Sequence, residues 1–176
     1  MILGNKVFLR SPEMSDLQSF YKWHNDEELK KIAMMNPYHV SLELENDWLK
    51  NVISDKDNRN MTFVIVERST DSVLGYSQLK NINWISRNAW FGIIIGNKNK
   101  RNMGFGRETT ELMIDYAFNS LNLNKLQLEV LEINSNAIDL YLKMNFTNEA
   151  QLRQHFFCEG EYLDTVIMSL LREKGI

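Results

Sequence analysis

The chain is poor in residues that form covalent cross-links or metal sites. A single cysteine, Cys158, excludes an internal disulfide framework, and we expect it to be an ordinary small thiol. The three histidines, His24, His39 and His155, have no spacing typical of a metal motif. The sequence therefore predicts no structural metal ion.

Long apolar runs and excess positive charge are also missing. Residues 1–6 lack the apolar core of a signal peptide, and no run reaches the roughly 18 apolar residues of a membrane-spanning helix. We therefore expect a cytoplasmic protein that does not enter the membrane. The 20 Lys and Arg residues are outnumbered by 23 Asp and Glu residues, whereas nucleic-acid-binding domains are usually basic. We expect no nucleic-acid partner.

The composition is that of one globular domain spanning residues 1–176, because 44% of the residues are hydrophobic and the length suits a single core. Alternating and continuous apolar patterns predict strands at 7–10, 61–67, 73–79, 88–95, 126–131, 146–157 and 162–171. Helical spacing predicts helices at 15–24, 41–52 and 135–144, a short helix that follows a break at 25–28 and runs through Ile32, and a helix that starts at Phe105 and whose end is marked by Asn122. Ser15 and Gln18 form a capping-box pattern for the first helix, and Ser41 is the expected cap of the third.

A glycine loop between a strand and a helix is the most informative stretch. Residues 101–106 read RNMGFG, so that Gly104 and Gly106 open the helix, and Lys98, Lys100 and Arg107 add positive charge. The first amides of a helix have no intrahelical partner and carry the positive end of its dipole, which favours phosphate. The dinucleotide and Walker patterns both fail here. A solvated turn with a permissive hinge is the alternative interpretation.

A second motif lies downstream, where residues 134–146 read NSNAIDLYLKMNF. Together with R-x-x-G-x-G, this segment resembles the GNAT superfamily of acetyl-CoA-dependent N-acetyltransferases, in which it commonly reads N-x-x-A-x-x-L-Y-x-K-x-G-F. The likeness extends over the whole chain and is greatest to the branch of ribosomal-protein-alanine and spermidine acetyltransferases. Asn145 replaces the family's glycine, but asparagine also tolerates a left-handed backbone.

The resemblance implies an α/β (α+β) fold with a mixed, mostly antiparallel sheet of about seven strands, splayed between the fourth and fifth and flanked by helices. It also implies acetyl-CoA as cosubstrate, with its pyrophosphate on the glycine loop and its pantetheine arm along the edge of strand 88–95. The residues thereby expected to bind the cofactor are Ile93, Ile94, Ile95, Arg101, Asn102, Met103, Gly104, Phe105, Gly106, Arg107, Asn134, Asn136 and Lys143. Asn134 is either a helix cap alone or a cap that also contacts the cofactor.

By the same resemblance Tyr141 is the general acid that protonates the departing CoA thiolate, whereas periodicity alone favours a residue that packs beside Leu140. A phenol is mostly protonated at neutral pH and can give up this proton. The glutamate that often serves as base in this branch is replaced by Trp90. Glu129, Glu132 and His24 are alternatives, and the sequence assigns none of them.

The acceptor is expected to be a primary amine: a small molecule, an amino sugar or a protein N-terminus. Positions that carry carboxylates in polyamine acetyltransferases hold Met35, Asn36, Gln78 and Trp90, which disfavours a polyamine. Glu43, Glu45 and Asp47 are either another acidic patch or residues that stabilise a helix dipole. The expected substrate pocket is formed by Trp23, Tyr38, Gln78, Trp84 and Trp90, with Ser77 and Phe156 as further candidates. A spermidine acetyltransferase and a non-catalytic acetyl-CoA-binding domain are the alternative functions, and a homodimer is the expected assembly.

Overall fold

The protein is described by a computed structural model that covers residues 1–54 and 58–172. Its eight strands form one sheet in the order β1-β2-β3-β4-β5-β6-β8-β7. The strands are β1 (Ile2–Leu3), β2 (Val7–Arg10), β3 (Met61–Glu67), β4 (Val73–Asn83), β5 (Asn88–Ile95), β6 (Lys125–Leu131), β7 (Thr147–Cys158) and β8 (Glu161–Leu171). Neighbouring strands are antiparallel except β5 and β6, so the expected mixed sheet is confirmed. The strand missed by the sequence is β1, which has only two residues.

The helices are α1 (Leu17–His24), α2 (Glu27–Ile32), α3 (Leu42–Ser54), α4 (Phe105–Asp115) and α5 (Ser135–Lys143). Ser41 caps α3 as predicted, because its hydroxyl accepts from the Leu44 amide at 3.2 Å. The predicted capping box of the first helix is wrong. A 3₁₀ turn, Met14–Asp16, precedes α1, and the Glu13 amide donates to the Asp16 carboxylate at 2.8 Å. In the described part of the chain, no helix has the length and apolarity needed to cross a bilayer.

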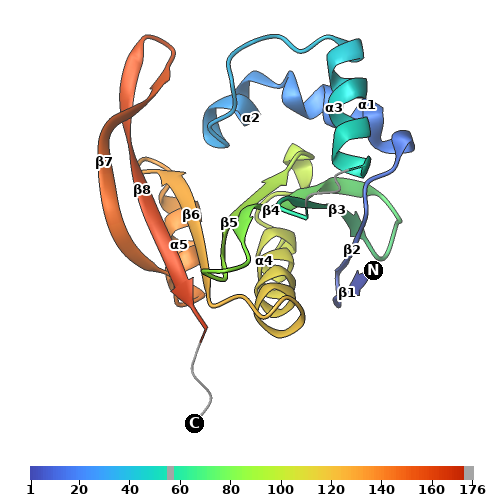
Figure 1. Cartoon of the computed structure of the whole chain (residues 1–176). Coiled ribbons are helices and arrows are strands. Elements are labelled where there is room, and N and C mark those ends of the chain that lie inside the picture. The colour runs from blue at the N-terminus through green and yellow to red at the C-terminus, as the bar shows by residue number, and fades with distance from the viewer. Residues whose placement is uncertain (55–57, 173–176) are drawn as a thin grey trace.

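Helices cover both faces of the sheet (Figure 1). On one face α1, α2 and α3 pack through Phe20, Leu29 and Leu49 against strand residues such as Val64. On the other face α4 and α5 pack against alternate residues of the same strands. The alternation of strand side chains between two faces therefore gives the protein two apolar cores.

The sheet opens between β5 and β6. The parallel pairing of these strands ends at Trp90 and Gln127, yet β5 continues to Ile95 and β6 to Leu131. This is the splay predicted from the family resemblance. In Figure 1 the β7–β8 hairpin rises opposite α2 across this opening, and Lys31 of α2 reaches Glu159 at the hairpin turn, at 2.5 Å.

Candidate active site

A cavity of about 1840 Å³ surrounds the gap between β5 and β6. Its lining comes from α1 to α3, from strands β3 to β7, from the loop after β5 and from α5. One cavity therefore joins the predicted phosphate loop, the predicted general acid and the helices that precede the sheet.

The glycine loop enters this cavity in the geometry that the sequence suggested. Gly104 precedes α4 with a left-handed backbone, φ +87°, a conformation that glycine adopts without strain. The far side of the loop is anchored to the N-terminal segment, because Glu108 accepts from the amides of Lys6 and Val7 at 2.8 and 3.1 Å. Lys6 Nζ also donates to the Met103 carbonyl at 3.1 Å. The first-turn amides of α4 are thereby held in place at the cavity wall.

Most of the residues expected to contact acetyl-CoA line this cavity. They are Ile93, Ile94, Ile95, Arg101, Asn102, Gly104, Gly106, Arg107, Asn134, Asn136 and Lys143. Met103 and Phe105 do not line it. Met103 is half exposed, and Phe105 is buried in the core beneath α4, with the Lys100 ammonium 5.9 Å from its ring centroid. The Phe105 side chain packs in the core and the Met103 side chain meets solvent. We therefore expect only the backbone atoms of these two residues to contact the cofactor.

The basic side chains of the loop are engaged with carboxylates. Lys98 lies 2.8 Å from Glu28, which Arg101 also contacts, and these two cations hold the pKa of Glu28 below its usual range. Lys100 pairs with Glu67 at 2.9 Å. The expectation that Lys98 and Lys100 supply free positive charge at the helix start is therefore corrected. They tie the loop to α2 and β3, which leaves anion binding mainly to backbone amides.

Tyr141 projects from α5 into the same cavity and packs in the core beneath it. Its side chain is 8% exposed and contacts the rings of Phe91 and Phe146, with centroid distances of 6.4 and 5.5 Å. Burial raises the pKa of Tyr141 to about 12. The neutral phenol therefore persists throughout the physiological range, as a proton donor requires.

The two ends of α5 are formed as the motif predicts. Asn134 caps its start by accepting from the Ala137 amide at 3.3 Å. Asn145, which replaces the family's glycine, has a left-handed backbone with φ 65° just after the helix. The replacement therefore preserves the turn that places Tyr141.

The wall opposite the loop is aromatic and rich in amides. Trp48, Trp90 and Phe156 provide rings, and the carboxamides come from Asn36, Asn51, Asn60, Gln78 and Asn81. Gln78 is oriented by the Thr62 hydroxyl, 3.0 Å from its Nε2. Trp48, Asn51 and Asn60 were missed because a single residue on a helix or in a turn gives no sign of which cavity it borders.

The structure does not bring four of the expected pocket residues to the lining. Trp23 is buried against Gly96 beneath α1, and Ser77 is buried within the sheet, where its hydroxyl donates to the Gly92 carbonyl at 3.2 Å. Tyr38 is exposed, and Trp84 lies on a β4–β5 turn, where its indole donates to the Asn58 carbonyl at 3.2 Å. Of the named pocket residues, Gln78, Trp90 and Phe156 line the cavity.

Two of the three alternative bases line the cavity. His24 does so from the end of α1, and Glu129 from β6, where it accepts from the Thr165 hydroxyl at 2.6 Å and lies 3.7 Å from His155. Glu132 is bonded instead to Gln151, at 2.9 Å, and is not part of the lining. Within residues 1–54 and 58–172, no cluster of histidine, cysteine or acidic side chains is suited to a metal ion.

Comparison with known proteins adds an independent observation. Residues 6–147 match the model of the acetyltransferase (GNAT) domain. The chain is 33% identical to the spermidine N(1)-acetyltransferase of Vibrio cholerae, over 98% of this chain and 96% of that protein. It is 29% identical to the Escherichia coli K12 protein of the same name, over 97% and 89% of the two chains.

A solved structure with a comparable sequence identity shares the fold. The Vibrio cholerae spermidine N-acetyltransferase in complex with CoA and spermine superposes with a TM-score of 0.88 at 30% identity, covering 96% of each chain. An uncharacterized N-acetyltransferase of Bacillus licheniformis is 29% identical over 96% of this chain and 94% of its own.

Proposed function

The chain belongs to the acetyltransferase (GNAT) family, and on that premise we propose that it transfers the acetyl group of acetyl-CoA to the primary amine of an amino sugar. Acetyl-CoA is the acetyl donor of this family, and the residues of this chain fit it. The proposal goes beyond the family assignment in two respects: it assigns roles to individual residues, and it names the class of amine that accepts the acetyl group.

The observation that carries this function is the convergence of three features on one gap. Past Trp90 the edges of β5 and β6 are not paired with one another, so their peptide groups are available to an extended chain such as pantetheine. The glycine loop lies at one end of the gap, and Tyr141 lies beside it. A thioester held along Ile93 would have its phosphates at the loop and its sulfur near the phenol.

This arrangement supports direct attack of the amine on the thioester. The carbonyl oxygen gains negative charge as the amine nitrogen forms its bond to carbon, and a fixed amide near Ile93 stabilises that charge by a few kcal/mol. The carbon–sulfur bond then breaks, and Tyr141 gives its proton to the thiolate. The nitrogen releases its extra proton to solvent as the amide forms, and the phenolate of Tyr141 takes a proton back from solvent. The net products are the N-acetylated amine and CoA.

The lining of the acceptor side favours a hydroxyl-bearing substrate with a single amino group. Carboxamides both donate and accept hydrogen bonds, which suits sugar hydroxyls, and the rings of Trp48 and Trp90 offer flat apolar surfaces. Five Lys and Arg residues line the cavity, against three acidic residues, Glu28, Glu129 and Asp139. Glu28 is already paired with Lys98 and Arg101. Several ammonium groups would find few free carboxylates here.

The second candidate acceptor is spermidine, and the similarity to the Vibrio cholerae and Escherichia coli enzymes favours it. Glu129 and Asp139 are the acidic residues that could hold its ammonium groups, because neither is engaged by a lysine or arginine among the described ion pairs. Because spermidine carries several ammonium groups, this candidate requires a second carboxylate, besides Glu129, that faces the acceptor. Asp139 lies instead on α5, the helix that carries Tyr141.

The function is tested by CoA thiol release from acetyl-CoA with glucosamine, spermidine and a peptide with an N-terminal alanine as acceptors. Glucosamine is expected to give the highest kcat/KM, and Tyr141→Phe is expected to lose turnover while retaining acetyl-CoA binding. Tyr38→Phe, a matched change at an exposed tyrosine, serves as the control. Binding of acetyl-CoA without thiol release for any acceptor would indicate a non-catalytic domain instead.

A further inference from the structure

We propose that Tyr76, His24 and Glu45 form a proton relay that removes the ammonium proton of the acceptor, an inference that rests on the proposed function. An alkylammonium has no lone pair, so the acceptor must lose a proton before it can attack. Trp90 occupies the place where the family's glutamate is expected. The relay supplies the base from α1, α3 and β4, whereas Trp90 lies on β5.

The three side chains are connected by short hydrogen bonds at the cavity wall. His24 Nδ1 lies 2.9 Å from both carboxylate oxygens of Glu45, and His24 Nε2 lies 2.9 Å from the Tyr76 hydroxyl. Glu45 is 1% exposed and Tyr76 is 6% exposed, and both His24 and Tyr76 line the cavity. The chain of bonds therefore runs from a buried carboxylate to a phenol at the cavity.

The donors and acceptors assign one tautomer. An ionised carboxylate only accepts, so His24 carries its proton on Nδ1, and Nε2 then accepts from the Tyr76 hydroxyl. When the ammonium gives its proton to Tyr76 Oη, the phenol proton passes to His24 Nε2. The amine becomes neutral, and the imidazolium keeps both hydrogen bonds with Glu45 and Tyr76. No rearrangement is needed between the two states.

The electrostatic setting favours this transfer. Glu45 lies in the first turn of α3 and His24 is the last residue of α1, so the helix dipoles stabilise a negative and a positive charge at these respective places. Burial, together with the charge of Glu45, raises the pKa of Tyr76, so the phenol conducts the proton without remaining ionised. The other groups packed on the imidazole ring are the uncharged rings of Phe20 and Trp48.

The relay and Tyr141 lie on opposite faces of the sheet. Tyr76 packs in the core beneath α1 and α3, whereas Tyr141 packs in the core beneath α4 and α5. In the register of β4 and β5, Tyr76 stands opposite Ile94, one residue from the Ile93 pair. The proposed proton acceptor and the proton donor therefore belong to opposite faces of the sheet, and both line the cavity near Ile93.

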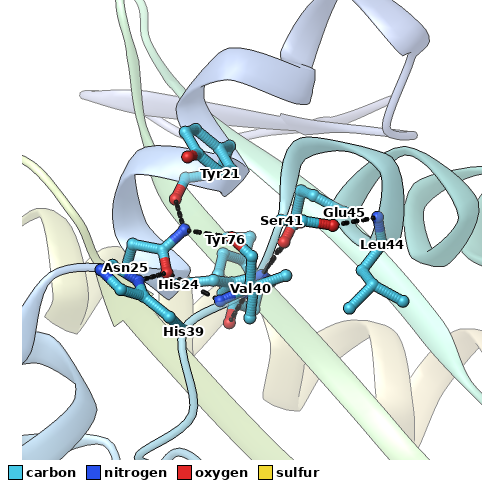
Figure 2. A network of polar contacts seen from close by, with 9 residues as sticks. All are labelled: Tyr21, His24, Asn25, His39, Val40, Ser41, Leu44, Glu45 and Tyr76. Carbon is cyan, nitrogen blue, oxygen red and sulfur yellow. Dashed lines mark hydrogen bonds and ion pairs between the residues drawn. The ribbon is translucent and has the colours of Figure 1, made fainter.

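A second network holds the relay in place (Figure 2). The Asn25 side-chain amide donates to the carbonyls of Tyr21 and Val40, both at 3.0 Å, and its oxygen accepts from the Val40 amide at 2.9 Å. These bonds fasten the segment before α3 to the end of α1. The position of Glu45 and the imidazole of His24 relative to one another is thereby fixed at the cavity wall.

The capacity of the relay to take up a proton is tested on the holoprotein without any acceptor. Long-range ¹H–¹⁵N spectra of the histidine rings, recorded with acetyl-CoA bound, are expected to show His24 protonated on Nδ1 and gaining a second proton on Nε2 upon acidification. Tyr76→Phe is expected to change the Nε2 signal. Observation of the Nε2–H tautomer, or no uptake of a second proton, would overturn the relay even if the enzyme is active.

The kinetic test compares His24→Gln, Tyr76→Phe and Glu45→Gln with the parent, using glucosamine and spermidine as probe acceptors. Loss of a general base is expected to lower kcat/KM by about 100-fold or more at pH 7. The variants are then expected to gain up to tenfold per pH unit until the pH passes the pKa of the acceptor amine, so the difference shrinks at a lower pH for glucosamine than for spermidine. Acetyl-CoA affinity is expected to stay unchanged.

His39→Gln is the matched control, because His39 bonds to Asn25 in the neighbouring network but is exposed and lies outside the cavity lining. It is expected to keep the parent profile. A His24→Gln enzyme that loses activity equally at every pH would show a merely structural role and refute the relay. Absence of turnover by the parent with both acceptors would refute the proposed function. The histidine spectra test the relay without any acceptor, so they distinguish failure of the relay from failure of the proposed function.

Discussion

The two glycines of the glycine loop, Gly104 and Gly106, have different backbone conformations. Substitutions at the two positions can therefore separate an effect on loop structure from an effect on cofactor binding. Gly106 lies within α4 with an ordinary helical backbone, and a Cβ added to it would meet its nearest neighbour, Ile95 Cγ1, at 3.8 Å. This is normal van der Waals contact, so Gly106→Ala fits the protein without strain. Gly104 has φ +87°, which strains any other residue.

These environments predict opposite effects on stability. Alanine in place of a helical glycine stabilises by about 0.5–1 kcal/mol, which for a chain of this size raises Tm by about 1–4 °C. Gly104→Ala is expected to lower stability by about 1–2 kcal/mol, because it forces a left-handed backbone on a residue with a Cβ. A loss of binding in a Gly104 variant would therefore be ambiguous, whereas a loss in Gly106→Ala would not.

The effect on acetyl-CoA follows from the position of Gly106 in the cavity wall. A methyl group there occupies space next to the first-turn amides and prevents the close approach of a phosphate oxygen. Loss of one hydrogen bond to a charged group, about 1.5–3 kcal/mol, weakens binding by about 10- to 100-fold. Calorimetric titration with acetyl-CoA and thermal melts provide both numbers. An unchanged Kd in a Gly106→Ala protein of raised Tm would refute the assignment of the loop to the pyrophosphate.

Further predictions concern the acid, the acceptor wall and the link between the loop and α2. Tyr141→Phe is expected to lower kcat by about 100-fold or more with an unchanged acetyl-CoA Kd in calorimetry. Because burial raises the pKa of Tyr141 to about 12 and the neutral phenol is the active form, the rate is expected to show no fall centred near pH 10; such a fall, absent from Tyr141→Phe, would contradict the assignment. Trp90→Ala is expected to raise KM for glucosamine about tenfold or more, through loss of an aromatic contact, in steady-state assays where saturation by acetyl-CoA is unaffected. Glu28→Gln removes the carboxylate that Arg101 contacts and leaves Lys98 paired with Asp26 alone, so acetyl-CoA is expected to bind more tightly at low salt, and the advantage should disappear as ionic strength rises in the same titration.

The sequence predicts the parts of the fold that depend on local periodicity. Helices α2 to α5 and strands β2 to β8 occur where the apolar spacing places them, and the left-handed backbone at Asn145 follows from the residue type alone. The start of the first helix was misplaced. Asp16, which is buried and pairs with Arg10 at 2.7 Å, accepts from the Glu13 amide, so a 3₁₀ turn begins after Glu13 and α1 itself only at Leu17. A tertiary contact overrides the local signal there.

The residues expected at the glycine loop line the cavity more consistently than those expected at the acceptor pocket, for a physical reason. Backbone amides and a helix start suit phosphate, and glycine spacing indicates such a loop in the sequence. The acceptor wall instead collects single side chains from several distant elements, which only the packing brings together. Trp23 and Trp48 are both on helix stripes, yet one is buried against Gly96 and the other lines the cavity. The pairing of His24 with Glu45 likewise depends on how α1 and α3 cross.

The central claim is that the chain moves an acetyl group from acetyl-CoA to an amine, and the most direct test is mass spectrometry of the products. The purified protein would be incubated with acetyl-CoA labelled in its acetyl group, together with glucosamine, spermidine and cell extract, and compared with Tyr141→Phe. The account predicts a labelled N-acetyl amine, most abundant for glucosamine, that depends on Tyr141. Release of labelled acetate alone, or no labelled amine in any mixture, would contradict it.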